Sequence, residues 1–587
     1  MADRNLAAYH RNVRKFVQDC YTEAKQRSDE LRGVNTENLE FFLGVDKQAE
    51  EEARKHPLVK QSRLFIPEIS PAIHNRRARI VSALETSEFP IKIRPAAQDA
   101  TAEDRKKAAS IERRINTQLR DCGYLTAGFE EQFIAAEIFR SPAAVKVTWE
   151  RPDDKEAVLS EGPVASVQYR KQYPHGRIVV QMLEVDRFLY EPNLDDFYNS
   201  SYAFDCIWEP YEKALALARR SGWDTKKMRR VKDDIRNAER SEKSVSQEAA
   251  ETAGMPLSYW YQDGEVLIAE GYLTIVKDDG SIHRRKTVMV GDRHIVHDER
   301  ANTLTPLPFA VVTANKLPGS IEGFSSVDIA KPLQRVYSAS YNSWLDGITY
   351  RLFPPMKAPY NMQFKEQVQW EPLFIIMCSD PDRLQPVVSN PGTLPDLVPV
   401  MSSISMAIRR LLSVTDLHEG FTNVPYEKAT SARLRFGAAS QGIMPMFKQY
   451  GRVIKQVATL VLKLNQEHHP QKEQFVVSGG LTIDVPSLSS ISDPDMERQN
   501  SFLLYSQALE NPFYATPRGQ IYLRQLWEDF VRALKPYDVE SLVPSVKEVE
   551  KDLAAKVELT KIEQEKRSAL EQTALQQEEE EKQNVGV

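Results

Sequence analysis

Apolar residues in the first 140 positions of the chain recur at helical spacing, with charged residues between them. Spacings of three and four residues are typical of amphipathic helices that pack one face on a core. The pattern predicts helices over residues 7–31, 72–84, 102–119 and 125–139. The last of these carries an aromatic stripe, which we interpret as core rather than as a binding site: Phe129, Phe133, Ala136 and Phe139.

The pattern changes from helical spacing to alternation near residue 143. Residues 145–149 and 177–182 alternate between apolar and polar, which predicts two strands of an antiparallel sheet. A second β stretch covers 266–296 and contains a hairpin whose turn includes Gly280, a residue type that accepts the positive φ of such turns. Residues 143–315 are therefore predicted to be an α+β region.

A long apolar stripe predicts a helix over 325–351. Tandem prolines at 354 and 355 end this helix, because proline has no N–H group and restricts the residue before it. A β-containing insertion follows, and a second helix is predicted over 396–412. The apolar positions of the first helix share one face: Ile329, Leu333, Val336, Tyr337, Tyr341, Trp344, Leu345 and Ile348.

The chain continues with a loop over 413–428 and another long helix over 429–467. Pro445 lies inside this helix and predicts a kink. The region from residue 491 onward is predicted to be helical. It ends in an acidic run, four glutamates at 578–581, and shows no regular heptads of a coiled coil.

Composition narrows the class of protein. A chain of 587 residues is too long for one ordinary core and predicts two or more domains. The net charge of −6 excludes a globally basic DNA-binding protein but leaves room for a local basic surface. The four cysteines lie far apart, which favours folding in a reducing cytosol without disulfides. We expect neither a signal peptide nor a membrane-spanning segment, since the apolar stretch at 453–464 is short and interrupted by charges.

The strongest local basic cluster is predicted to be a helix over 219–243, with ten Lys or Arg against five Asp or Glu. Two interpretations are open. The favoured one is a solvated helix face with internal ion pairs, and the other is contact with nucleic-acid phosphate or an acidic partner. The residues considered for such contact are Lys226, Lys227, Arg229 and Arg230.

Motifs that would indicate an enzyme are missing from the sequence. There is no GxxxxGK[ST], GxGxxG, HExxH or GxSxG pattern. His468 and His469 are adjacent and so do not share a helix face, which disfavours metal binding. We therefore expect no catalytic residues, no metal and no cofactor. The alternatives are a metal-dependent nuclease subunit whose acidic residues converge only in the fold, or a scaffold for the assembly of other proteins.

The order of elements from 317 to 466 resembles the portal (head-to-tail connector) proteins of tailed double-stranded DNA bacteriophages. The resemblance rests on the helix with the stretch Y-N-S-W-L-D at 341–346, the β insertion, the returning helix, and the loop that opens a long helix beginning A-T-S-A at 429–432. The stretch E-V-D-R-F-L-Y-E-P at 184–192 also looks like part of a portal wing.

The resemblance implies a fold class that is α+β but mainly helical. It implies a ring protomer with wing, stem, clip and helical crown, and a wing that mixes helices with antiparallel sheet. The implied boundaries are wing 1–324, first stem helix 325–351, clip 352–395, second stem helix 396–412, tunnel loop 413–428, long kinked helix and return to the wing 429–490, and crown 491–587.

The resemblance further implies a structural, non-enzymatic role in the virion, with assembly in the host cytoplasm. Members form homo-oligomeric rings, usually dodecamers, at one capsid vertex. Double-stranded DNA passes through the ring during packaging and ejection. The implied partners are the terminase motor, adaptor and tail proteins, and capsid and scaffolding proteins, and no membrane. A mildly acidic chain suits a channel that must not hold DNA tightly.

Two groups of residues are candidates for these contacts, and each has a simpler interpretation. The channel candidates could instead form ion pairs or a surface turn, and the clip candidates could instead form a small core. The channel candidates are Arg409, Arg410, His418, Glu419, Phe421, Asn423 and Lys428. The clip candidates for partner docking are Phe353, Trp370, Phe374 and Ile375.

Overall fold

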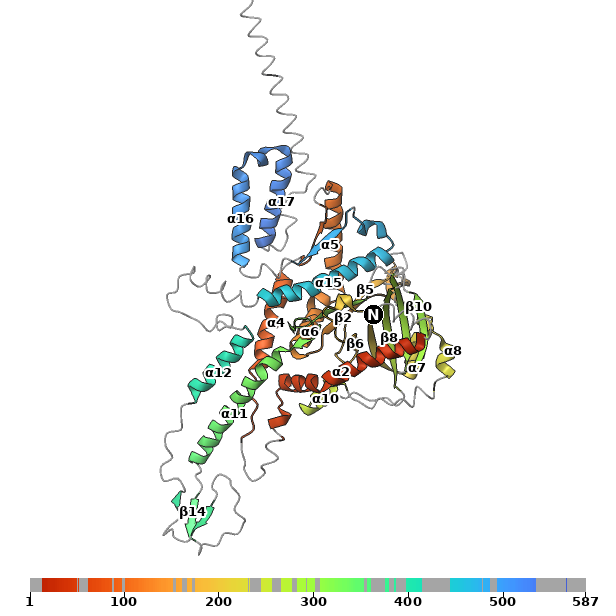
Figure 1. Ribbon diagram of the computed structural model, residues 1–587. Coiled ribbons are helices and arrows are strands. Elements are labelled where there is room, and N and C mark those ends of the chain that lie inside the picture. The colour runs from red at the N-terminus through yellow and green to blue at the C-terminus, as the bar shows by residue number, and fades with distance from the viewer. Residues whose placement is uncertain are drawn as a thin grey trace, which may run out of the picture. The chain divides into compact units, whose positions relative to one another are not determined.

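The computed structural model of the chain (Figure 1) describes residues 13–49, 51, 62–86, 89–97, 101–150, 155–160, 166–171, 175–230, 232, 244–255, 265–276, 282–291, 293–300, 307–352, 356–359, 375–378, 385–386, 397–413, 444–477, 479–485, 494–534 and 566. The chain divides into two compact units. The first comprises Met1–Glu427 and Gln441–Ser489, and the second comprises Lys428–Ser440 and Ser490–Val587.

The N-terminal part of the first unit is helical, as predicted. Its helices are α2 (Val13–Leu43), α4 (Ile69–Thr86), α5 (Ala102–Asp121) and α6 (Phe129–Ile138), with a π-helical turn η1 (Tyr124–Gly128) before α6. The prediction that the first helix ends at residue 31 is wrong, because α2 continues to Leu43. The core-facing side of its last turns carries the buried polar residues Asn35, Asn38 and Glu40 beside the buried Phe41, and this hides the helical period of apolar residues.

The stripe predicted on α6 is confirmed as core. Phe129, Phe133 and Ala136 are buried. They face α15 (Met444–His468), where Tyr450 places its ring 4.7 Å from that of Phe133 and 6.1 Å from that of Phe129, measured between centroids. The aromatic stripe therefore joins two helices that are distant in sequence.

Two antiparallel sheets form the α+β region that the alternation predicted. The smaller has the order β11-β2-β5, with β11 (Phe309–Val312), β2 (Ala143–Glu150) and β5 (Arg177–Met182). The larger has the order β10-β9-β8-β7-β6. Its strands are β6 (Phe188–Tyr190), β7 (Tyr202–Pro210), β8 (Glu265–Val276), β9 (Ile282–Val290) and β10 (His294–Arg300). A separate hairpin pairs β3 (Lys155–Ser160) with β4 (Ser166–Lys171).

The larger sheet is covered by helices on both faces (Figure 1). Because successive side chains of a strand point to opposite faces, Leu267 and Ala269 of β8 pack with α2. Val266 and Ile268 pack on the other face with α7 (Tyr211–Ser221) and α8 (Thr225–Arg230). The predicted hairpin is confirmed by the pairing of Tyr272 with Lys286, although its turn lies outside the described residues.

The prediction of a single basic helix over 219–243 is wrong for the residues that the structure describes. Helix α7 ends at Ser221, and Gly222 follows with a left-handed φ of 73°. Glycine adopts that conformation at little cost and so ends the helix. The chain turns there, buries Trp223 and restarts as the short helix α8. A further helix, α10, covers Val245–Thr252.

A buried ionic cluster links the two sheets. Lys146 Nζ on β2 lies 2.8 Å from Asp205 Oδ2 on β7 and 2.6 Å from Glu270 Oε2 on β8. Arg187 and Lys286 add ion pairs of 2.9 Å to Asp205 and 3.3 Å to Glu270. Burial alone would raise the pKa of Glu270, but Lys146 and Lys286 outweigh it and lower that pKa to about 2.

The middle of the chain has the predicted order of elements. Helix α11 (Ser326–Leu352) ends just before the tandem prolines. Three short strands follow, β14 (Met356–Pro359), β15 (Ile375–Cys378) and β16 (Gln385–Pro386), in the order β15-β14-β16. Helix α12 (Val398–Leu411) then returns and packs on α11. Two further two-stranded sheets pair β12 (Asn315–Lys316) with β13 (Gly323–Phe324) and β1 (Lys92–Pro95) with β17 (Leu481–Asp484).

The predicted helix over 429–467 is described from Met444, as α15, followed by a 3-10 turn η3 (Lys472–Phe475). Residues 414–443 lie outside the described part, so Pro445 stands in the first turn of the described helix and the predicted kink stays a prediction.

The described residues 494–534 of the second unit form a helical hairpin. Helix α16 (Pro494–Glu510) and helix α17 (Pro517–Leu534) pack together across a 3-10 turn η5 (Pro512–Ala515). Their contact is aromatic, with ring centroids 5.5 Å apart for Phe502 and Phe530 and 5.1 Å apart for Tyr505 and Trp527. The predicted helical character of the C-terminal region is confirmed here, and the acidic run at 578–581 lies outside the described residues. The fold is α+β and mainly helical, as expected.

Candidate functional site at the base of α11 and α12

The first turn of α11 is closed by a reciprocal pair of side chains. The backbone N–H of Asp328 donates to Ser325 Oγ at 2.9 Å, and the backbone N–H of Ser325 donates to Asp328 Oδ2 at 3.1 Å. This capping box satisfies N–H groups that a helix start leaves unpaired. Arg140 binds the same carboxylate twice, with Nε 2.8 Å from Oδ2 and Nη2 3.0 Å from Oδ1. Burial alone would raise the pKa of Asp328, but the bonds from Arg140 and Ser325 lower it.

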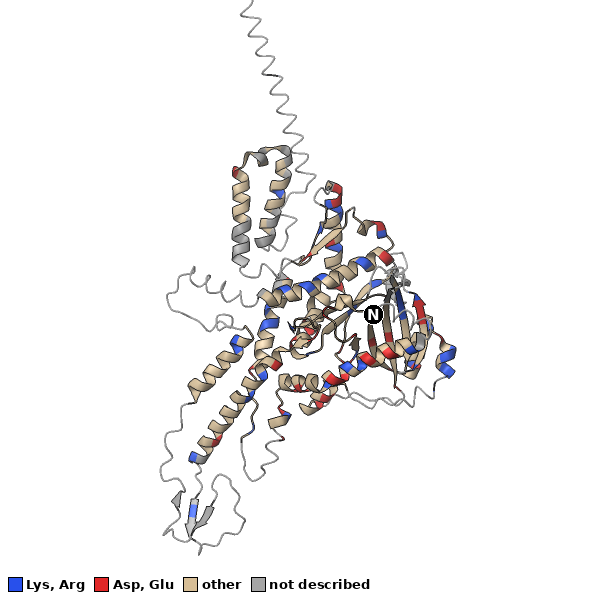
Figure 2. Cartoon of the chain, viewed as in Figure 1, with Lys and Arg blue, Asp and Glu red and all other residues tan. Residues whose placement is uncertain are grey.

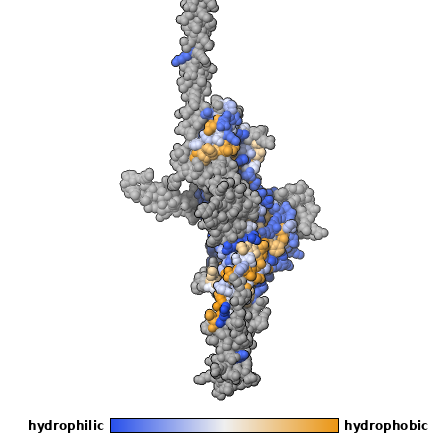
Figure 3. Space-filling model, turned by 90° about the vertical axis from the view of Figure 1, so that its left-hand side faces the viewer, coloured by the Kyte–Doolittle hydropathy of each residue, from blue (hydrophilic) through white to orange (hydrophobic). Residues whose placement is uncertain are grey.

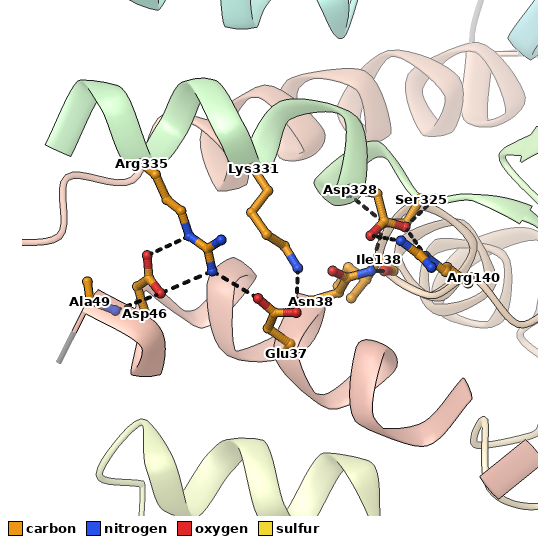
Figure 4. A network of polar contacts seen from close by, with 10 residues as sticks. All are labelled: Glu37, Asn38, Asp46, Ala49, Ile138, Arg140, Ser325, Asp328, Lys331 and Arg335. Carbon is orange, nitrogen blue, oxygen red and sulfur yellow. Dashed lines mark hydrogen bonds and ion pairs between the residues drawn. The ribbon is translucent and has the colours of Figure 1, made fainter. Parts of the chain in front are cut away.

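Buried amides on α2 hold this cap in place, and Figure 4 shows that of Asn38. Asn38 Nδ2 donates to the carbonyl of Ile138 at 3.2 Å and to Ser325 Oγ at 3.0 Å. One turn earlier, Asn35 Oδ1 accepts the backbone N–H of Arg140 at 3.0 Å. Helix α2 therefore fixes both the end of α6 and the start of α11.

A second row of contacts joins α2 to the next turns of α11 (Figure 4). Lys331 Nζ lies 3.1 Å from Glu37 Oε2. Arg335 reaches Glu37 Oε1 at 2.9 Å and Asp46 Oδ2 at 3.0 Å. Both cations also lie over the ring of Phe41, at 5.3 and 5.0 Å from its centroid. Since Lys331 and Arg335 are four residues apart, they share the face of α11 that meets α2.

One buried carboxylate connects four helices at the same place. Glu137 of α6 accepts hydrogen bonds from Arg76 Nη1 of α4 at 2.8 Å, from Tyr450 of α15 at 2.9 Å, and from Ser326 at the start of α11. Glu137 is fully buried, and Arg76 is nearly so. Burial raises the pKa of Tyr450, and the charge of Glu137 and the hydrogen bond to it raise it further. Glu137 therefore links α15 to the first turn of α11.

A polar ladder fixes the next part of α11 to the extended segment 62–68. Every second backbone N–H of the segment donates to a side chain at every fourth position of the helix. The bonds run from Ser62 to Asp346 Oδ1 (2.8 Å), Leu64 to Asn342 Oδ1 (2.9 Å), Ile66 to Ser338 Oγ (3.4 Å) and Glu68 to Gln334 Oε1 (3.0 Å). Four helical residues rise about 6 Å and two extended residues span about 6.6 Å, so the two periods match.

The ladder ends at Glu68, which also reaches α12. Ser405 Oγ donates to Glu68 Oε2 at 3.0 Å, and Arg409 Nη2 lies 3.7 Å from the same oxygen. Burial raises the pKa of Tyr337 on α11, and the neighbouring charge of Glu68 raises it further. A single carboxylate thus bridges the two helices.

The two helices keep apolar side chains in solvent. Val336 on α11 is 52% exposed and Val398 on α12 is 56% exposed. Figure 3 shows apolar surface on this part of the molecule. The exposed large apolar residues of the two helices are Ile329, Val336, Leu352, Val398, Val400, Met406 and Leu411. Ile408 of α12 is the fully buried member of its stripe.

The structure describes some of the residues selected from the sequence. Arg409 pairs with Glu68, Arg410 is exposed on α12, and Ile375 begins β15. The four basic residues considered at 226–230 are exposed on α8. Those outside the described residues are His418, Glu419, Phe421, Asn423, Lys428, Phe353, Trp370 and Phe374.

The residues that anchor α11 were not predicted from the sequence. Glu137 and Arg76 carry no local signal, because their pairing spans elements far apart in the chain. The ladder does carry a local signal, because Gln334, Ser338 and Asn342 recur at four-residue spacing along one edge of the apolar stripe. Within the described ranges, no group of three or more His, Cys, Asp or Glu is arranged to hold a metal. No helix in the described part of the chain is long and apolar enough to span a bilayer.

Comparison with known proteins identifies the family. A family model described as Phage SU10 portal protein matches residues 132–489, which is more than half of the chain and includes α11, α12 and α15. The chain belongs to this family of phage portal proteins. It is thus a structural protein of a phage capsid, and the resemblance seen in the sequence is confirmed. No curated protein matches the chain.

Proposed function

We propose that the chain assembles into a homo-oligomeric ring, a dodecamer as in the family it resembles, at one vertex of the capsid. The lumen of the ring conducts double-stranded DNA during packaging and ejection. The ring docks the terminase motor first and adaptor or tail proteins afterwards. In this proposal α11 and α12 are the stem, 352–395 is the clip, 413–428 is the tunnel loop, and the boundaries of wing and crown are those given above.

The proposal rests on the contacts of the α11–α12 pair, because the rest of the protomer supports this pair on one side only. Polar side chains of α11 are engaged by α2 and by the segment 62–68. Apolar side chains of both helices are left exposed. A helix pair with exposed valine and leucine gains free energy when neighbouring copies cover them. Repeated head-to-tail contact that closes produces a ring.

The charge pattern of α12 supports a conduit rather than a tight DNA-binding site. Arg409 is partly neutralised by Glu68, whereas Arg410, next to it, is exposed. A channel for DNA of any sequence needs few strong phosphate contacts, because each one adds to affinity and slows passage. We assign Arg410 and the loop residues His418 and Lys428 to the channel, and Ile375 with its neighbours to partner docking.

Negative-stain electron microscopy and mass photometry of the purified chain test the proposal together. We expect rings with a central hole and a mass close to that of a dodecamer. Compact particles of one or two protomers, at all protein concentrations and with a scaffolding protein present, would contradict it.

A further inference from the structure

A basic surface covers the outer side of α7 and α8. Residues 219–230 contain six Lys or Arg and a single carboxylate, Asp224. Figure 2 shows α8 as a run of basic residues beside the larger sheet. The six cationic residues are all exposed, and we call them the α7–α8 patch: Arg219, Arg220, Lys226, Lys227, Arg229 and Arg230.

The backbone between α7 and α8 brings these residues together on one surface. Gly222 ends α7 in a left-handed turn, and Trp223 and Met228 are buried against the sheet. The Asp224 N–H donates to the Val296 carbonyl at 3.0 Å, which fixes α8 beside β10. Burial of the apolar side chains points the intervening basic ones to solvent.

Among the residues that the structure describes, the patch shows few of the ion pairs of an ordinary solvated helix. In the described part of the chain, Arg219, Arg220, Lys226, Arg229 and Arg230 have no carboxylate partner, whereas nearby Lys213 pairs with Glu209 at 2.8 Å. Asp224 is engaged in capping α8, where its Oδ1 accepts the Lys227 N–H at 3.0 Å. Asp224 is the one described carboxylate of the predicted helix over 219–243, so the internal ion pairs expected with its other acidic residues stay a prediction.

We propose that the α7–α8 patch binds the phosphate backbone of double-stranded DNA without sequence preference, independently of passage through a channel. Four of the six cations are arginine, whose planar guanidinium forms two parallel hydrogen bonds with phosphate. Among the described residues 211–230, the two aromatic residues Trp223 and Tyr211 are buried, so neither ring is available to stack on a base.

DNA fits the patch better than an acidic protein does. Protein interfaces depend on a desolvated apolar or aromatic centre. Leu217, 38% exposed, is the one large apolar side chain with substantial exposure among the described residues 211–230. Phosphate binding needs no such centre, since it draws on the release of counterions.

The test uses a relaxed, covalently closed DNA minicircle, because a closed circle cannot be threaded through a ring. Binding is measured by gel shift over a series of salt concentrations. The test variant is R219Q/R229Q/R230Q. The matched control is R105Q/K106Q/R113Q, which removes three exposed cations of α5 that lie among the carboxylates of that helix.

We expect the wild-type chain and the control to bind minicircles of two unrelated sequences equally well. For the test variant, affinity at low salt falls at least about tenfold, and the slope of log K against log salt becomes shallower by about 3. Equal losses in both variants, or wild-type binding no tighter than that of the test variant, would overturn the proposal. The second outcome would leave an acidic protein as the partner. Mass photometry of the same samples reports ring assembly separately, so failure of the portal proposal is distinguishable.

Discussion

The side-chain amide of Asn342 binds the backbone of Leu64 at both polar groups. Its Oδ1 accepts the Leu64 N–H at 2.9 Å, and its Nδ2 donates to the Leu64 carbonyl at 3.0 Å. An asparagine of a helix thus pairs with an extended segment much as a neighbouring strand would. The segment 62–68 is held by the same helix at Ser338 and Gln334, so its path is fixed by α11.

Replacing this amide should loosen the segment. In Asn342→Ala, the amide hydrogens of 62–68 should exchange with solvent about tenfold faster, which corresponds to loss of about 1.4 kcal/mol. Hydrogen–deuterium exchange followed by mass spectrometry of the peptide measures this. Ser343→Ala, at an exposed neighbouring position of α11, is the control and should leave exchange unchanged. Equal exchange in the two variants would show that the ladder does not hold the segment.

Removing the charge of Glu137 should destabilise the first unit strongly. Glu137→Gln leaves the Arg76 guanidinium buried without a charged partner, at a cost of about 3 kcal/mol or more in the free energy of unfolding. Urea unfolding followed by tryptophan fluorescence measures the change. The double variant R76M/E137Q should recover part of the loss, because no unpaired charge remains.

An exposed ion pair provides the comparison. Glu209→Gln removes the pair with Lys213 at 2.8 Å, and we expect a loss of at most about 0.5 kcal/mol. If Glu137→Gln were as mild as Glu209→Gln, the buried carboxylate would not be what joins α4, α6, α11 and α15.

The cluster around Glu270 should make the protein sensitive to acid. The pKa of Glu270 is lowered from 4.5 to about 2, so this carboxylate contributes stability that is complete above pH 4.5 and is lost as the pH falls toward 2. The contribution is about 3 kcal/mol. Glu270→Gln should be less stable than wild type at pH 6 and should lose less stability between pH 5 and pH 3. Urea midpoints across this range measure both effects.

Glu212→Gln serves as the control for that titration, since Glu212 is exposed on α7. Its urea midpoint should follow the wild-type curve. A Glu270→Gln curve parallel to that of the wild type would refute the role of the buried cluster in acid sensitivity.

A charge on the exposed apolar side of α12 should block ring assembly without unfolding the chain. Val400 is 46% exposed, and Val400→Lys places an ammonium group where the proposed neighbouring copy packs. Mass photometry should show protomers in place of rings, while the thermal unfolding midpoint stays near that of the wild type. Ser402→Lys, at an exposed polar position of the same helix, should still assemble. Assembly of both variants would contradict packing of copies through this side of α12.

Local patterns in the chain were enough to predict its elements. Apolar spacing located α4, α5, α6 and α11, alternation located β2 and β5, and the tandem prolines marked the end of α11. The order of these elements also pointed to the portal family, which the family match confirms. These features depend on neighbours in sequence, so a single chain is sufficient to read them.

Only the tertiary structure decided which polar residues join the helices. Glu137 meets Arg76 across 61 positions and Tyr450 across 313, and no periodicity connects such partners. The same holds for α2, whose buried Asn35 and Asn38 look like surface residues in the sequence yet fix the start of α11. A buried polar group must find its hydrogen-bond partner wherever the fold supplies one, and long-range packing alone determines where that is.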